Sequence, residues 1–400
     1  MAGALGASAA FRPATRAARV FLERNPYVPW EAQRPAFAHP AFTGVVHPHL
    51  PHWGAPADDS PPGEKRPRDR ATPRDEATDA AEFDLPAEPT SASRSWLPRV
   101  ARLGPMEARA LPETHVQTVS ASWCHDAEDA RALMRAAADA GASVLLCVSG
   151  DGGRGDPSSL DALALLRHAR ALRDAGEIEP DVRLACAANP CLEALHLLTP
   201  LATSRNREAS ASPSSLLAAK LEAGAEMVIT QPSIVPSLAR LWRREIQESG
   251  VARDAEHVAG LAIPASTRSA KKWARLVFGD AKSRADAFAK HVTGTNTIDT
   301  RAASRHACFS ETESLLRASI RAELLDGWRA MERGAARRRE TDPRDARAFQ
   351  TRWIEERAEL AAAEILTSRD FPARGAHVMP VTPAGYRSAA ALADAIRRLL

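Results

Sequence analysis

From Thr114 onward, short apolar runs alternate with longer amphipathic stretches along the chain. Each apolar run is followed by a turn rich in glycine or proline, then by a stretch rich in Ala, Leu and Arg, and then by another glycine. A short apolar run predicts a buried strand, and an amphipathic stretch predicts a helix with one apolar face. The predicted strands are His115–Ser122, Val144–Ser149, Val182–Ala188, Met227–Gln231, His257–Ile263 and Ala376–Val381.

The predicted helices end at glycines, which can adopt the left-handed conformation that stops a helix. In the first of them we expect Asp126 to cap the start and Gly141 to mark the end. Its apolar stripe is formed by Ala130, Leu133, Met134 and Ala137. Further helix ends are expected near Gly176, Gly224, Gly250 and Gly279. Apolar strands that alternate with helices predict an α/β fold with a parallel sheet, either a closed (β/α)₈ TIM-type barrel or a doubly wound sheet.

The chain before Thr114 departs from this pattern. Residues 1–30 form an N-terminal segment that contains either a first strand or a transit peptide, because the first 22 residues are rich in Arg, Ala and Ser and lack acidic residues. A mitochondrial or plastid location is the alternative to the cytoplasm, although an ordinary N-terminus can have this composition by chance. Residues 31–112 are rich in proline and lack apolar periodicity, which predicts a partly disordered insertion, with Phe42–Val46 as a candidate second strand.

The main body, residues 113–400, contains a second insertion at about 280–374. This stretch is longer than one connecting helix requires, and its pattern predicts two exposed helices, Ser310–Arg333 and Asp345–Ile365. The basic run Arg337–Arg339 between them is interpreted as solvated surface, since exposed arginines usually are only that. An irregular start of the barrel and a long insertion before its last strand are therefore expected.

Composition narrows the class of protein. The 400 residues are 44% hydrophobic and 26% charged, with a net charge of +3 spread among interspersed acidic and basic residues, which is typical of a soluble globular chain and argues against nucleic-acid binding. No apolar run approaches the roughly 18 residues of a membrane span. The five cysteines are scattered without a CxxC pair, so we expect a reducing compartment and no metal site.

A glycine-rich loop follows the Val144–Ser149 strand. Gly150, Gly152 and Gly155 match GxGxxG, and such a loop could cradle a phosphate at the start of the next helix. A dinucleotide-binding Rossmann unit also needs an acidic residue about 20 residues later to hold the ribose. The next strand ends in Cys186–Pro190 without a carboxylate, which disfavours that unit. A phosphate-binding barrel enzyme without flavin remains an alternative.

Five sequence blocks occur in an order that is more specific than any one motif. They are Val144–Asp151 (VLLCVSGD), Leu184–Pro190 (LACAANP), Lys220–Gln231 (KLEAGAEMVITQ), Val258–Pro264 with the helix Ser269–Leu276, and Gly375–Met379 (GAHVM). Together they resemble the methylenetetrahydrofolate reductase family over about Thr114 to Val381. The resemblance implies a flavoprotein with an FAD-binding TIM barrel that moves a hydride from NAD(P)H through the flavin to 5,10-methylenetetrahydrofolate. The product would be 5-methyltetrahydrofolate, in one-carbon metabolism and methionine biosynthesis. The implied partner is a small folate-like molecule, and a homo-oligomer is compatible with this interpretation.

The resemblance also implies a set of site residues. Asp151 matches an aspartate near the flavin ring, and Gly150 matches a glycine that allows close approach to the cofactor. Lys220 matches a lysine that reaches the FAD phosphates, and Asn189 matches a strand-end residue near the flavin. Gln231 matches a glutamine that hydrogen-bonds the folate ring, for which an amide can both donate and accept.

Glu23 matches the glutamate that acts as proton donor at the end of the first strand, where an acid is needed to open the folate's five-membered ring.

Two departures from the family pattern bear on activity. Ser149 stands where some members have arginine, and Pro232-Ser233-Ile234 replaces the aromatic residues expected after Gln231. Aromatic rings hold folate and nicotinamide by stacking, which these residues cannot do. The alternative is a non-catalytic or assembly-type barrel derived from the same family, which uses the 280–374 insertion to bind a partner protein.

Overall fold

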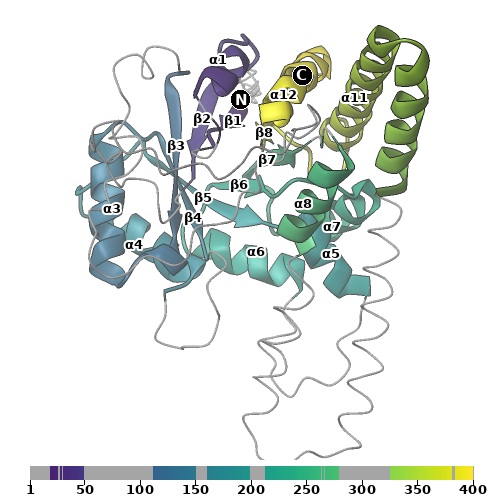
Figure 1. Ribbon diagram of the computed structural model, residues 1–400. Coiled ribbons are helices and arrows are strands. Elements are labelled where there is room, and N and C mark those ends of the chain that lie inside the picture. Colours follow the sequence, from purple (N-terminus) through teal and green to yellow (C-terminus); the bar gives the residue numbers. More distant parts are fainter. Residues whose placement is uncertain are drawn as a thin grey trace, which may run out of the picture.

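Eight parallel strands close into a barrel in the computed structural model (Figure 1). The structure describes residues 19–25, 28, 30–48, 111–149, 160–198, 212–262, 264, 266–278, 325–380 and 383–399. The strands are β1 Arg19–Glu23, β2 Gly44–His47, β3 Thr114–Ser120, β4 Val144–Val148, β5 Arg183–Ala188, β6 Met227–Thr230, β7 Glu256–Leu261 and β8 Gly375–Val378. The sheet closes where β1 pairs with β8, with Leu22 opposite Val378. The predicted (β/α)₈ barrel is therefore confirmed, and the doubly wound alternative is wrong because that sheet would have two open edges.

Helices cover the outside of the barrel. Those with defined bounds are α1 Trp30–Phe37, α3 Ala127–Asp139, α4 Ala162–Asp174, α5 Pro190–Leu198, α6 Pro213–Glu222, α7 Pro236–Ser249, α8 Thr267–Phe278, α11 Pro343–Leu366 and α12 Pro383–Leu399. Residues 325–341 form a further helix beside α11 (Figure 1). A short 3₁₀ turn, Ala121–Trp123, follows β3.

The local signals of α3 work as predicted. The Asp126 carboxylate accepts the Asp129 N–H at 2.8 Å, which satisfies a donor that the first helical turn leaves unpaired. The expected stripe of Ala130, Leu133, Met134 and Ala137 is buried. Glycines with positive φ follow α3, α4, α6 and α7, at Gly141, Gly176, Gly224 and Gly250. Gly279 lies outside the described residues.

The first two strands are regular members of the barrel. β1 ends at Glu23, as the resemblance implied, and β2, Gly44–His47, overlaps the candidate strand Phe42–Val46. The helix between them, α1, was not predicted. Its buried residues are Gln33, Ala36 and Phe37, and Pro35 lies inside it, so its sequence has little of the apolar periodicity that indicates a helix. Residues 30–48 therefore belong to the barrel, and residues 49–110 lie outside the described part.

The second insertion is folded against the barrel. The helix α11 agrees with the prediction, and of the other predicted helix only the part from Leu325 is described. Most residues of α11 are exposed or half-buried, but the helix also packs on α12, α7 and β7 through a buried stripe that was not expected. That stripe is mostly alanine, so it was not recognised as an apolar face. Trp328 of the neighbouring helix meets Trp353 of α11 edge to face, with ring centroids 4.3 Å apart.

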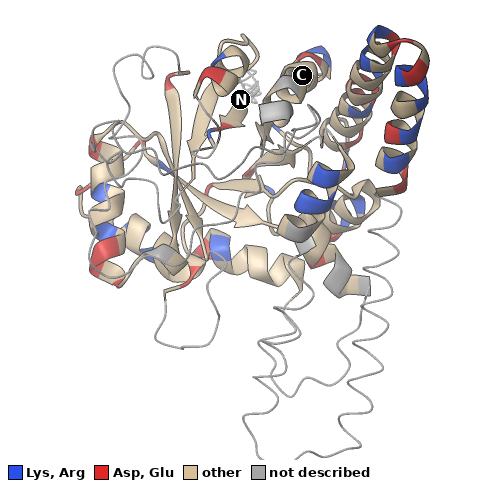
Figure 2. Cartoon of the chain, in the orientation of Figure 1, with Lys and Arg blue, Asp and Glu red and all other residues tan. Residues whose placement is uncertain are grey.

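The inside of the barrel is apolar and filled by alternate residues of the strands. Phe21, Val46, Val116, Val144, Leu146, Ala185, Met227, Ile229 and Val258 form this inner cluster. The residues between them point outward and pack against the helices. On the helices, acidic and basic side chains are interspersed, most densely on α11 and its neighbour (Figure 2). No helix in the described ranges is long and apolar enough to cross a membrane.

Candidate functional site

The carboxyl ends of the strands in such a barrel meet at one face, where barrel active sites lie. Glu23 is the last residue of β1, Asn189 follows β5, and Gln231 follows β6. These residues, predicted from three separate segments, thus share the carboxyl face of the barrel. Gly150 and Asp151 lie outside the described residues, so their roles remain predictions.

A hydrogen-bond network fixes the backbone at Glu23. The buried hydroxyl of Tyr386, on α12, lies 2.9 Å from the Glu23 carbonyl oxygen and 2.8 Å from Gln33 Oε1, either of which can accept its hydrogen. The same hydroxyl accepts the Asn25 N–H at 2.8 Å, and the Gln33 amide donates to the Asn25 carbonyl at 2.7 Å. Burial raises the pKa of Tyr386 well above its usual value, so the hydroxyl keeps its hydrogen. The end of β1 is therefore held by α1 and α12 together.

The Glu23 side chain points into the barrel towards a histidine. Phe21 belongs to the inner cluster, so Glu23, two residues on, points to the same side. Its Oε2 lies 3.4 Å from Nε2 of His377 on β8. His377 is 3% exposed, and neither of its ring nitrogens has a hydrogen bond in the described part of the chain. A buried polar group left in that state costs about 1–3 kcal/mol, so the pair is poised to form a hydrogen bond.

Sequence reasoning missed His377. It lies in the predicted last strand, Ala376–Val381, where an isolated histidine in an apolar run gave no signal by itself. The alternation of side chains along the strand gives the direction of His377 once the fold is known. Ala376 and Val378 pack outward, so His377 between them must point into the barrel.

The loop after β6 crosses the inner face of β7 at Gly260. A Cβ at Gly260 would lie 2.1 Å from the Thr230 carbonyl oxygen and 2.5 Å from the carbonyl carbon of Gln231. Only glycine permits this approach, which is secured by the Gly260 N–H donating to Thr230 Oγ1 at 2.7 Å. The Gln231 N–H donates to the Ala188 carbonyl at 2.8 Å. The backbone of Gln231 is thus fixed, while its half-buried side chain has no hydrogen bond within the described ranges.

Lys220 is not a solvated surface lysine. From α6 its ammonium group reaches the carboxyl end of β5 and donates to the Ala187 carbonyl at 2.7 Å. Ala187 is one residue beyond the last pair between β4 and β5, Cys147 with Cys186, so Lys220 satisfies a carbonyl that this pairing leaves open. An ammonium has three donors, and among the described residues two of them have no partner and remain for a ligand.

Asn189 has a structural role that needs no ligand. Its side-chain oxygen accepts the Leu192 N–H at 3.1 Å and so caps α5, while its amide donates to the Val277 carbonyl at 2.8 Å. The Glu193 carboxylate in the first turn of α5 in turn accepts the Asn189 N–H at 2.9 Å. The expected contact with a flavin remains a prediction, and it would have to use donors and lone pairs that these bonds leave over.

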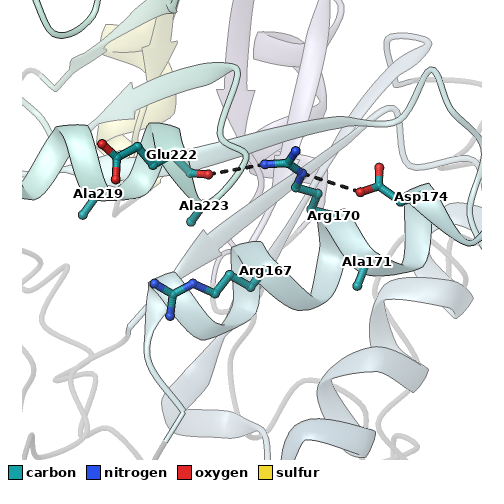
Figure 3. Close-up of a pocket in the computed structure, with 7 residues that line it drawn as sticks. All are labelled: Arg167, Arg170, Ala171, Asp174, Ala219, Glu222 and Ala223. Carbon is teal, nitrogen blue, oxygen red and sulfur yellow. Dashed lines mark hydrogen bonds and ion pairs between the residues drawn. The ribbon is translucent and has the colours of Figure 1, made fainter.

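The amino end of the barrel is closed by ion pairs. Arg183 lies 2.6 Å from Glu256 and 3.8 Å from Glu226, Arg19 lies 3.6 Å from Glu256, and Arg173 lies 2.5 Å from Glu226. A groove of about 460 Å³ lies on the outer wall between α4 and α6, lined by alanines and by Arg167, Arg170, Asp174 and Glu222 (Figure 3). This groove is separate from the carboxyl face, and its Arg170 is already bound to Asp174 and to the Glu222 carbonyl.

The buried cysteines Cys186 and Cys191 are poor candidates for a nucleophile. Burial raises the pKa of Cys186 to about 11 and that of Cys191 to about 12, so both are thiols at neutral pH. A thiol is a weak nucleophile compared with a thiolate. They pack as small hydrophobic side chains between the barrel and its helices.

Comparison with known proteins yields only distant similarity. No model of a known protein family matches the chain, and no curated protein sequence matches it. A solved structure of an uncharacterized protein from Clostridium thermocellum, which binds two copies of 5-methyl-5,6,7,8-tetrahydrofolic acid, aligns over 96% of this chain and 97% of its own, with 11% identity and a TM-score of 0.42. A 2,3-dimethylmalate lyase of the PEP mutase/isocitrate lyase superfamily aligns over 62% of this chain and 68% of its own, with 13% identity and a TM-score of 0.34. Neither similarity is close enough to bear on the ligands or the activity of this chain, and the barrel is established by its strand pairing.

Proposed function

We propose that this protein is an FAD-dependent oxidoreductase similar to methylenetetrahydrofolate reductase, which uses NAD(P)H to reduce 5,10-methylenetetrahydrofolate to 5-methyltetrahydrofolate. The observation that carries the proposal is the placement of Glu23, Gln231 and Lys220. Three separate sequence motifs nominated them, and each reaches the carboxyl end of the same closed barrel.

Among the described residues, Lys220 is suited to FAD. Lys220 offers a cation at the carboxyl end of β5, with two donors that no residue of the described ranges uses, suited to a phosphate oxygen. Bound FAD would supply a two-electron carrier between the nicotinamide and the folate.

The remaining roles fall to the chain. The Gln231 amide, on a fixed backbone, can donate to and accept from the edge of a pterin ring, which orients the substrate. Glu23 would hold a proton at its carboxyl group and give it to the folate nitrogen that is released when the five-membered ring opens. The apolar floor below, formed by Phe21 and its neighbours in the inner cluster, excludes water from that proton transfer.

A non-catalytic barrel that binds a partner through the 280–374 insertion is the competing proposal. The lost aromatic residues after Gln231 favour it. The described helices of the insertion give it less support, because α11 buries one face on α12, α7 and β7 and leaves a surface of mixed charge (Figure 2).

Anaerobic half-reactions test the reductase proposal. NADH or NADPH should bleach the flavin, and methylenetetrahydrofolate should then restore its colour. Glu23→Gln should leave the bleaching intact and slow the recovery by about 10²-fold or more, since general acids typically contribute 10²–10⁴-fold. Bleaching without recovery in the unaltered protein would show that the electron acceptor is not a folate. Equal recovery rates for both proteins would remove Glu23 from the reaction.

A further inference from the structure

The contact between His377 and Glu23 is unusual for a buried histidine. Both side chains come from the inner face of the barrel, on adjacent strands β8 and β1. The His377 ring is almost completely buried, yet neither nitrogen is hydrogen-bonded among the described residues. A histidine kept only for packing would be expected to have at least one ring nitrogen satisfied.

The surroundings leave Glu23 as the natural partner of the imidazole. On the β7 side, the residue paired with His377 is Gly260, which has no side chain. On the β1 side, the paired residue is Phe21, which cannot form a conventional hydrogen bond. Glu23 lies two residues further along, with Oε2 already 3.4 Å from Nε2.

The Glu23 carboxyl group can move closer to the His377 ring while the backbone stays in place. Tyr386 and Gln33 fix the chain at Glu23 and Asn25, so only the side-chain torsions of Glu23 are free to adjust. A small rotation would bring Oε2 within hydrogen-bond distance of Nε2.

We propose that His377 is a positioning residue for Glu23: its Nε2–H binds one carboxyl oxygen and turns the other towards the mouth of the barrel. The inference rests on the proposed function, in which Glu23 is the acid. The proton on the outward oxygen passes to the folate nitrogen as its carbon–nitrogen bond breaks. Glu23 is left as a carboxylate whose inner oxygen still accepts the His377 N–H. No proton leaves the imidazole in this step.

Ring-nitrogen NMR tests the contact without any ligand. In protein labelled with ¹⁵N-histidine, the Nε2 signal of His377, assigned with His377→Gln, should have the position of a protonated, hydrogen-bonded nitrogen. It should move in Glu23→Gln. His257 is the internal control: its Nδ1 is bound to the Phe371 carbonyl on the outer wall, so its signals should not change. An unchanged His377 signal in Glu23→Gln would overturn the proposal.

Kinetics test the positioning role. His377→Leu should slow the folate-dependent recovery of flavin colour by about 10- to 100-fold, since misplacing a reacting group by about 1 Å can cost about 10²-fold. His377→Gln places an amide N–H near the position of Nε2 and should recover most of that loss. Both variants should reduce and bind flavin normally, and circular dichroism should show both folded. Equal recovery rates in His377→Leu and the unaltered protein would contradict the inference, and so would a Gln variant as slow as the Leu variant. Failure of the reductase proposal is seen separately, as a protein without flavin, whereas the NMR result does not depend on flavin.

Discussion

The ammonium group of Lys220 lies 2.7 Å from the carbonyl oxygen of Ala187, at the end of β5. The contact joins the helix layer to the carboxyl face of the barrel, and it places a positive charge where the proposal needs a phosphate partner. Lys220→Met keeps the length of the side chain and removes the charge. We expect the dissociation constant for FAD to rise about tenfold, equivalent to about 1.4 kcal/mol. Quenching of flavin fluorescence on binding measures it.

Lys271→Met is the matched control for this prediction. Lys271 is exposed on α8, so its loss should leave FAD affinity unchanged. Equal affinities in the two variants would remove Lys220 from the cofactor site.

Gly260 sets the path of the loop that holds Gln231. In Gly260→Ala the new methyl group would meet backbone atoms of Thr230 and Gln231, which cannot swing aside as a flexible side chain could. We expect a loss of about 1–3 kcal/mol in the free energy of unfolding, the usual cost of overpacking. Urea denaturation measures it.

Gly327→Ala is the control for Gly260→Ala. Gly327 lies inside the helix at 325–341, and its nearest heavy atom to a new Cβ is 3.6 Å away. The free energy of unfolding of this variant should rise by about 0.5–1 kcal/mol, because alanine is the better helix former. A Gly260→Ala variant as stable as the unaltered protein would contradict the tight packing of the Thr230–Gln231 backbone on Gly260.

Tyr386 holds the backbone beside the proposed acid. Tyr386→Phe removes the nearer of the two acceptors of the Asn25 N–H, which keeps Gln33 Oε1 at 3.1 Å, and takes the donor from Glu23 and Gln33. We expect a destabilisation of about 1–3 kcal/mol and a slower folate-dependent step, with flavin reduction unaffected. His39→Gln is the control, because His39, which follows α1, pairs with the exposed Asp394 of α12, and this pair should contribute less than about 1 kcal/mol. Equal folate-dependent rates in Tyr386→Phe and the unaltered protein would mean that the network does not position Glu23.

His257 makes the stability depend on pH. Burial lowers its pKa from 6.5 to about 4, against the opposing effect of the hydrogen bond to Phe371. Between those two values the unfolded chain binds a proton that the native state does not, so stability rises with pH across this window. Because of this histidine, the free energy of unfolding should fall by about 3 kcal/mol as the pH falls from 6.5 to 4, at 1.36 kcal/mol per pKa unit.

Denaturation of His257→Gln and of the unaltered protein at several pH values measures this contribution. The difference in stability between them should change by about 3 kcal/mol across the window. A constant difference between His257→Gln and the unaltered protein would show that His257 is protonated in the native state.

The sequence predicts the regular part of this fold well because its signals are local. Asp126 and Gly141 bound α3 by backbone chemistry that acts within one turn, and the apolar strands follow from burial on both faces of the sheet. The prediction fails at α1, where a buried Gln33 takes the place of an apolar residue and is satisfied by the distant Tyr386.

The candidate site is predictable only in part. Glu23, Lys220 and Gln231 belong to recognisable motifs, and each is at a carboxyl strand end or reaches one. The roles of His377 and Gly260 depend on the closure of β8 onto β1 and on the approach of β6 to β7. Such relationships join residues far apart in the chain, and no local pattern encodes them.

The absorption spectrum of the purified protein, before and after addition of FAD and removal of the excess, shows whether this barrel binds flavin. We expect a bound oxidised flavin with bands near roughly 370 and 450 nm, a property of the cofactor itself. A protein that stays colourless after FAD has been added and removed would contradict it.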